Sequence, residues 1–182
     1  MNKTTPFLLA LFCLFLGTTV MAQENQVIQD KSAVSFKIKN GGFWVNGSFS
    51  DFTMKGVFNP EHLGNSRLDG NLRVKSLDTG IKKRDKHLLE DSYFDAEKYS
   101  TISLKSTQIS KNAKGYIWTG DLQIKGVKKT VSIPFTSEDK GDYFLLKGEL
   151  QINRIDFGVG GKSWLMNKNV YIQLACAVQK TS

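Results

Sequence analysis

Residues 116–124 read YIWTGDLQI, and this stretch decides the fold of the 182-residue chain. Alternate positions, from Tyr116 through Gly120 to Ile124, are apolar or glycine, whereas Thr119 and Asp121 between them are polar. A strand with one face in a core and the other in water shows this period of two. The alternation also favours antiparallel pairing, because the strands of a parallel sheet are usually apolar on both faces.

Similar stripes occur on both sides of this stretch. Their apolar or glycine positions are Val34, Phe36 and Ile38; Leu68, Gly70, Leu72 and Val74; Phe144, Leu146, Gly148, Leu150 and Ile152; and Val170, Ile172, Leu174, Cys176 and Val178. Shorter candidate strands lie at 47–52, 55–58, 101–108 and 130–135. About eight or nine strands in succession predict one all-β domain, and closing the sheet into an antiparallel barrel would remove its exposed edges.

One segment, residues 79–99, breaks the alternation and predicts a short helix of about two turns after the fourth strand region. Its charged residues would face water, whereas Leu88, Leu89 and Phe94 would cover an apolar surface. We therefore expect a barrel with one small helix set against it.

The inward stripes carry no charged residue, so whatever the barrel holds should be apolar. Three glycines, Gly70, Gly120 and Gly148, interrupt these stripes. A glycine within a strand marks either a bend or a place where something approaches the backbone. The three glycines therefore either open a lumen or form tight barrel corners, and the sequence leaves both readings open.

The first 22 residues predict a secretory signal peptide. A lysine precedes the almost wholly apolar residues 7–20, and Val20-Met21-Ala22 suits the cleavage site. The domain would then span 23–182, with Cys176 as its one cysteine, so a hydrophobic core and not a disulfide must hold it together. After the leader no stretch of about 18 apolar residues predicts a membrane helix, so we expect a soluble periplasmic or secreted protein without stable membrane insertion.

Signatures of catalytic, metal and cofactor sites are missing from the sequence. His62, His87 and Cys176 have no metal-ligand spacing, and neither a Gly-x-Ser-x-Gly elbow nor a phosphate-binding glycine loop occurs. We expect no catalytic residue, no metal and no cofactor. The net charge of +8 is spread over many strands, and export argues against a nucleic-acid partner. This charge favours solubility or, alternatively, an anionic membrane surface or head group.

Several short motifs occur in a distinctive order: SAVSF at 32–36, VNGSF at 45–49, RDKHL at 84–88, YFDAEKY at 93–99, GDLQIKGVKK at 120–129 and RIDFG at 154–158. Taken together, they resemble the YceI-like family of exported lipid-binding proteins. The resemblance covers residues 30–178. It implies a lipocalin-like extended antiparallel barrel with a short helix, which holds a polyisoprenoid or another long apolar molecule along its axis. It also implies a periplasmic or secreted location.

We therefore expect non-catalytic binding or carriage of a long apolar lipid, similar to a polyisoprenoid, a fatty acid or a fatty amide. The residues expected to form the lumen wall are Val34, Phe36, Leu72, Val74, Leu104, Trp118, Leu122, Phe144, Leu146 and Ile172. At the mouth, Arg84, Asp85 and His87 are expected either to orient a head group or to pin the helix to the rim. Trp164 is expected either to rim the mouth or only to cap the barrel end.

Two other functions stay open at this point. A barrel plugged by its own side chains would be an interaction module, and a polar cluster with shifted pKa values in the lumen would indicate an enzyme that acts on an isoprenoid or lipid. A homodimer is also possible, because Tyr171, Ala175 and Ala177 form an outward row on the last stripe.

Overall fold

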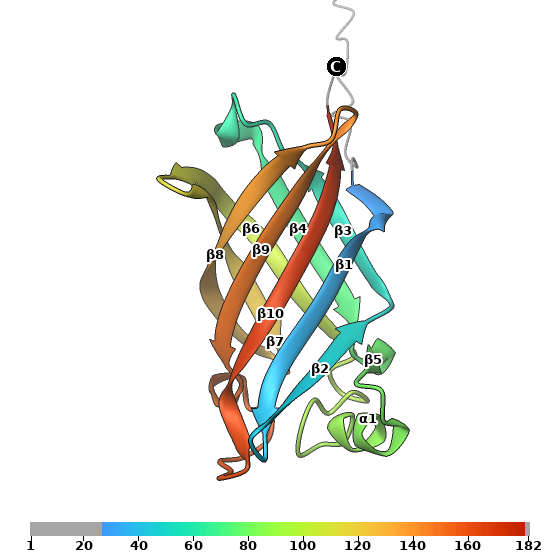
Figure 1. Ribbon diagram of the computed structural model, residues 1–182. Coiled ribbons are helices and arrows are strands. Elements are labelled where there is room, and N and C mark those ends of the chain that lie inside the picture. The colour runs from blue at the N-terminus through green and yellow to red at the C-terminus, as the bar shows by residue number, and fades with distance from the viewer. Residues whose placement is uncertain (1–26, 181–182) are drawn as a thin grey trace, which may run out of the picture.

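The computed structural model describes residues 27–180, so the predicted signal peptide, residues 1–22, lies outside the described residues. Ten strands form one antiparallel sheet, in the order β3-β4-β6-β7-β8-β9-β10-β1-β2-β5, and Figure 1 shows that it curls into a barrel. The strands are β1 (Val27–Asn40), β2 (Phe43–Phe49), β3 (Phe52–Val57), β4 (Arg67–Arg73), β5 (Leu77–Asp78), β6 (Thr101–Asn112), β7 (Gly115–Ile124), β8 (Val127–Asp139), β9 (Tyr143–Asn153) and β10 (Met166–Gln179). The predicted all-β antiparallel barrel is confirmed.

The expected short helix is α1 (Lys82–Leu88), which follows β5 and lies at one end of the barrel. Three single-turn 3-10 helices, η1 (Leu63–Asn65), η2 (Val74–Ser76) and η3 (Arg154–Phe157), join strands. The strand number exceeds the expected eight or nine because β5 has only two residues, too few to show a period. Within residues 27–180, no helix is long and apolar enough to cross a membrane.

A side-chain amide bridges the seam where the curled sheet meets itself. Strands β1 and β3 are not neighbours in the strand order, yet Gln29 of β1 reaches Met54 of β3. The Gln29 Nε2 donates to the Met54 carbonyl at 2.8 Å, and the Met54 N–H donates to Gln29 Oε1 at 3.2 Å. One glutamine thus supplies the donor and the acceptor that a paired strand would have offered, so the edge of β3 is covered at this point.

The two ends of the barrel differ. One end, named the aromatic end here, carries the β3–β4, β6–β7 and β8–β9 connections and is packed by four rings. Phe58 lies edge-on to Tyr116, Phe135 and Phe144, with ring centroids 5.2–5.7 Å apart. The opposite end, named the helix end, carries α1, the β1–β2 and β7–β8 turns and residues 158–165. The interior is therefore filled at the aromatic end.

The three inward glycines have different environments. A Cβ at Gly120 would lie 2.6 Å from the backbone oxygen of Lys105, and one at Gly148 would lie 3.1 Å from Ile133 Cγ2. A Cβ at Gly70, by contrast, would meet nothing within 4 Å. Gly120 and Gly148 are thus sites of close approach, whereas Gly70 opens space inside the barrel.

The outward row on β10 does not form an exposed surface. Ala177 is 0% exposed in the single chain, and Tyr171 and Ala175 are only partly exposed. Ala177 lies opposite Ile28 on β1 and Leu145 on β9, and its N–H donates to the Ser32 hydroxyl at 3.1 Å. The hint of a dimer surface that this row gave is therefore wrong at Ala177.

Cys176 is buried on the inner face of β10, opposite Leu146. Desolvation raises the pKa of its thiol from 9.0 to about 12, although a hydrogen bond with Ser32 opposes the shift. The unfolded thiol ionises near pH 9 while the folded thiol keeps its proton. Unfolding in alkali therefore releases a proton, and stability falls as the pH rises.

We expect the unfolding free energy of the wild type to fall by about 1.4 kcal/mol more than that of Cys176→Ala between about pH 8 and about pH 10. Urea titrations of the two proteins at both pH values measure this difference, and the comparison cancels the lysines and tyrosines that titrate in the same range. Equal losses in the two proteins would contradict the raised pKa.

Candidate ligand-binding cavity

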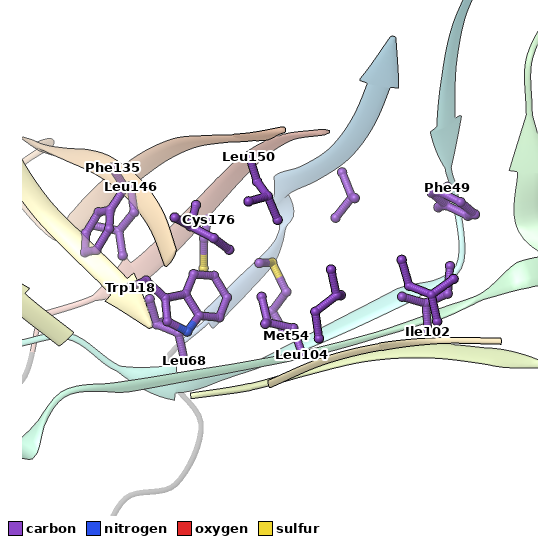
Figure 2. Close-up of a cluster of buried hydrophobic side chains, with 14 of the residues drawn as sticks. Phe49, Met54, Leu68, Ile102, Leu104, Trp118, Phe135, Leu146, Leu150 and Cys176 are labelled. Atoms are coloured by element: carbon purple, nitrogen blue, oxygen red, sulfur yellow. The ribbon is translucent and has the colours of Figure 1, made fainter. Parts of the chain in front are cut away.

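A cavity of about 430 Å³ occupies the interior of the barrel. It lies between the helix end and the four packed rings of the aromatic end, which we call the aromatic cluster. Ligand pockets commonly have volumes of about 300–1,000 Å³. Its wall is predominantly apolar and comes from strands all around the barrel. Figure 2 shows the buried hydrophobic side chains of the barrel, with Phe49 and Ile102 at one end of the cluster and Phe135 and Leu146 at the other; Phe49 and Ile102 line the cavity, whereas Phe135 and Leu146 do not.

Seven of the ten predicted wall residues line this cavity. They are Val34, Phe36, Leu72, Leu104, Trp118, Leu122 and Ile172. Their placement follows from the strand period, since alternate side chains of one strand share a face of the sheet. The lining residues come from β1, β4, β6, β7 and β10, so the stripes converge on one space.

Val74, Phe144 and Leu146 do not line the cavity, so the predicted wall is corrected at these three positions. Phe144 packs in the aromatic cluster, and Leu146 is buried next to Cys176 beyond the closed end of the cavity. Val74 lies past the end of β4, in η2, and it is buried toward the helix end of the barrel. The period of two fixes the face of a residue but not its depth along the barrel.

Several lining residues were not predicted from the sequence. They include Phe49, Met54, Phe94, Leu165 and Arg154. Phe49 ends β2, whose first three residues are all apolar and hide the alternation, and Met54 lies on β3, which has only six residues. Arg154 stood in the RIDFG motif, and its place just after the apolar stripe of β9 was the available signal.

Arg84 and Asp85 hold the start of α1 to the end of β5 through a single threonine. Arg84 donates from Nε to the Thr79 hydroxyl and from a terminal nitrogen to the Thr79 carbonyl, both at 2.7 Å. Asp85 accepts from the Thr79 N–H at 2.9 Å and from its hydroxyl. This geometry fits the pinning role. Arg84 lines the cavity as well, whereas Asp85 does not.

His87 lines the cavity on the last turn of α1. Its Nδ1 lies 2.8 Å from Glu90 Oε2, and its ring meets the ring of Tyr93 edge-on at 4.9 Å. Tyr93 lines the cavity too. The helix end of the cavity is therefore polar on one side, where Arg84, His87 and Tyr93 meet.

Arg154 is the one charged side chain of the cavity wall that is buried, at 5% exposure within the described residues. Its guanidinium donates to four backbone carbonyls, those of Val159 at 2.8 Å, Asn167 and Gly161 at 3.0 Å, and Met166 at 3.2 Å. Desolvation lowers the pKa of Arg154, but the group stays charged at neutral pH. The lining residues on the strands are uncharged, and the charge at this end of the cavity comes from Arg154 in η3 and Arg84 in α1.

Trp164 does not line the cavity, and its side chain is 92% exposed. Its neighbours Ser163, Leu165 and Met166 do line the cavity. The segment before β10 thus forms part of the mouth, with Trp164 pointing away from the interior.

The lining residues supply few groups for acid–base or nucleophilic chemistry. Within the described part of the chain, no carboxylate or thiol lines the cavity, and no cluster of His, Cys, Asp and Glu has the arrangement of a metal site. Trp118 Nε1 is buried in the wall without a hydrogen-bond partner among these residues. The cavity can therefore enclose an apolar molecule and can offer polar contacts chiefly at its mouth.

An antiparallel sheet curled into a barrel around an apolar cavity that opens beside a short helix defines a lipocalin-like class of protein. Within that class the chain belongs to the YceI-like family, since residues 26–178 match the model of the YceI-like domain.

Two relatives illustrate the similarity in sequence. A UPF0312 protein of Photorhabdus laumondii is 35% identical over 99 residues, which cover 54% of this chain and about half, 52%, of that protein. A UPF0312 protein of Yersinia enterocolitica is 30% identical over 135 residues, which cover 72% of this chain and 70% of that protein.

Solved structures show the same fold. BcnA of Burkholderia cenocepacia superposes with a TM-score of 0.79 at 29% identity, over 84% of this chain and 99% of that one. A polyisoprenoid binding domain from Saccharophagus degradans superposes with a TM-score of 0.63 at 12% identity, over 86% of this chain and 98% of that one. The second likeness concerns the fold alone.

Proposed function

We propose that this protein binds one long apolar lipid, such as a polyisoprenoid, a fatty acid or a fatty amide, without chemical change. The observation that carries the proposal is the cavity, which has apolar walls, ends at packed aromatic rings and is polar at its helix end. Removal of apolar surface from water would drive binding, at about 25 cal/mol per Å² before association costs are deducted. A polyisoprenoid binding domain shares this fold, so the fold can accommodate a ligand of this class.

The orientation of the ligand follows from the polar groups. We propose that its tail lies between Trp118, Leu122 and Leu104, with its head group beside Arg84 and His87. Arg84 has already engaged two of its nitrogens with Thr79, so any contact with a head group comes from its remaining donors.

Two observations favour this function over its rivals. The open volume argues against a barrel plugged throughout by its own side chains, because plugging is confined to the aromatic end. The lining also favours binding over catalysis, because His87 is the one imidazole among the described lining residues, it lies at the helix end, and no carboxylate or thiol lines the cavity beside it. We further propose that the protein acts in the periplasm or outside the cell, after residues 1–22 are removed.

Tryptophan fluorescence tests the binding function directly. The chain has three tryptophans, so Trp44→Phe together with Trp164→Phe leaves Trp118 in the cavity wall as the sole reporter. We expect a long-chain prenol or a fatty amide to shift the Trp118 emission in a saturable, one-to-one manner.

A matched pair of variants controls this titration. Leu122→Glu puts a carboxylate into the apolar cavity and should weaken binding at least about 100-fold, whereas Gln123→Glu adds the same charge outside, opposite Lys128. Equal affinity of the two folded variants, or no saturable signal from any of the lipids, would refute the proposed function.

A further inference from the structure

The exposed hydrophobic side chains of the barrel gather at one end. Within residues 27–180, the large hydrophobic residues that stay exposed all belong to elements of the helix end: Phe43, Trp44, Ile81, Val127, Trp164 and Leu165. Single exposed hydrophobic residues are normal on a protein surface, but their confinement to one end is not explained by chance scatter.

Four of these residues lie on two adjoining segments. Phe43 and Trp44 begin β2, and Trp164 and Leu165 precede β10. The Gly41 N–H donates to the Leu165 carbonyl at 2.9 Å, so the β1–β2 turn is tied to the 158–165 segment. The four side chains form a surface that we name the aromatic rim. It lies at the helix end, opposite to the aromatic end, and its residues Phe43 and Trp164 are 78% and 92% exposed.

The two segments that carry the aromatic rim have charged residues of one sign. Residues 36–50 and 157–179 contain no aspartate or glutamate but include Lys37, Lys39, Lys162 and Lys168. Lys39 lies over the Trp44 ring at 5.2 Å, and Lys37 has Glu149 as a distant partner at 4.0 Å. The rim therefore combines exposed aromatic rings with lysines that no acidic residue of the two segments neutralises.

The aromatic rim also flanks the mouth of the cavity. Leu165 itself lines the cavity, and so do its neighbour Met166 and Val45, which follows Trp44. A surface bound at the rim would thus cover the route by which a molecule enters or leaves.

We propose that the helix end docks on an anionic lipid bilayer, with Phe43, Trp44 and Trp164 in the interfacial region and the lysines against the head groups. Tryptophan prefers this interface because its ring is apolar and its N–H is polar, and lysine extends a positive charge from an apolar stem. Juxtamembrane lysines bind anionic lipids by electrostatic attraction. A bilayer accounts for the exposed rings and for the positive charge of the two rim segments together. Docking places the mouth on the bilayer, from which the lipid of the proposed function would be taken up.

Vesicle flotation of the full protein tests the proposal. We expect binding to phosphatidylcholine vesicles that contain phosphatidylglycerol, weaker binding to pure phosphatidylcholine, and loss at high salt because screening shortens the reach of the charges. Phe43→Ser with Trp164→Ser should weaken binding. Lys162→Glu with Lys168→Glu should weaken it at least about tenfold, since each basic residue near the surface contributes measurably.

The matched control is Lys111→Glu with Lys114→Glu, which makes the same change of net charge near the β6–β7 turn at the aromatic end. This control should bind the vesicles as the wild type does. An equal loss in both charge variants, no vesicle binding, or a stable dimer that the serine variant disrupts would overturn the proposal.

The docking proposal rests on the proposed function only where it says that docking serves lipid uptake. Membrane docking and lipid binding can therefore be refuted separately. The Phe43 and Trp164 side chains do not line the cavity, so the serine variant should still bind a prenol delivered in solution. Vesicle binding without prenol binding would sink the lipid-carrying function and keep the docking surface. Prenol binding without vesicle binding would do the reverse.

Discussion

Gly70→Phe is expected to abolish lipid uptake while the barrel stays folded. Gly70 lines the cavity, its Cβ position faces open space, and its φ lies outside the left-handed region, so a larger residue fits without strain. A phenylalanine ring there would displace about five ligand methylenes at about 0.8 kcal/mol each, which corresponds to about 1,000-fold weaker binding. Titration with a long-chain prenol, monitored through Trp118, measures the loss.

Two alanine substitutions provide the controls. Gly70→Ala should bind lipid nearly as the wild type does and should match or exceed its stability by up to about 1 kcal/mol, because alanine restricts the unfolded chain. Gly120→Ala places the same methyl group 2.6 Å from the Lys105 carbonyl oxygen and should lower the unfolding free energy by about 1–3 kcal/mol. If folded Gly70→Phe binds lipid with wild-type affinity, the cavity is not the binding site.

Arg154→Met is expected to cause the largest loss of stability among single substitutions at the mouth. The guanidinium links four carbonyls of residues 159–167, and its removal leaves these acceptors without their buried donor. We expect the unfolding free energy to fall by about 3–5 kcal/mol, with faster hydrogen exchange in the 159–166 segment. Urea unfolding and exchange mass spectrometry measure the two effects.

Arg73→Met is the matched control, because Arg73 is exposed at the end of β4 and should change stability by less than about 0.5 kcal/mol. Arg154→Lys keeps the charge but not the planar fork, so it should recover only part of the loss. A drop below about 1 kcal/mol in Arg154→Met would mean that water replaces the guanidinium at little cost.

The sequence predicted the barrel because its alternation records which face of each strand is buried. It could not predict the depth of a residue along the barrel. Leu122 and Leu146 were therefore both predicted to form the lumen wall, although only Leu122 lines the cavity. Depth depends on the strand register and on where rings such as Phe58 fill the interior, and both arise from partners far apart in the chain.

The inward glycines and Arg154 at the mouth also depend on contacts with distant parts of the chain, which the sequence does not reveal. Gly70, Gly120 and Gly148 give one signal in the sequence, yet only Gly70 leaves open space, because the other two are met by atoms of neighbouring strands. Arg154 lies in the RIDFG motif, and the sequence assigns it no role. Its partners are backbone carbonyls, which no residue type reveals in advance.

Native mass spectrometry of the protein recovered from its own cells, followed by solvent extraction of whatever is bound, tests the central claim most directly. The account predicts a one-to-one adduct that extracts as a long apolar molecule and that is missing from Gly70→Phe prepared in parallel. Protein free of any adduct, even after incubation with lipids of the cell envelope, would contradict the claim that this cavity holds a lipid.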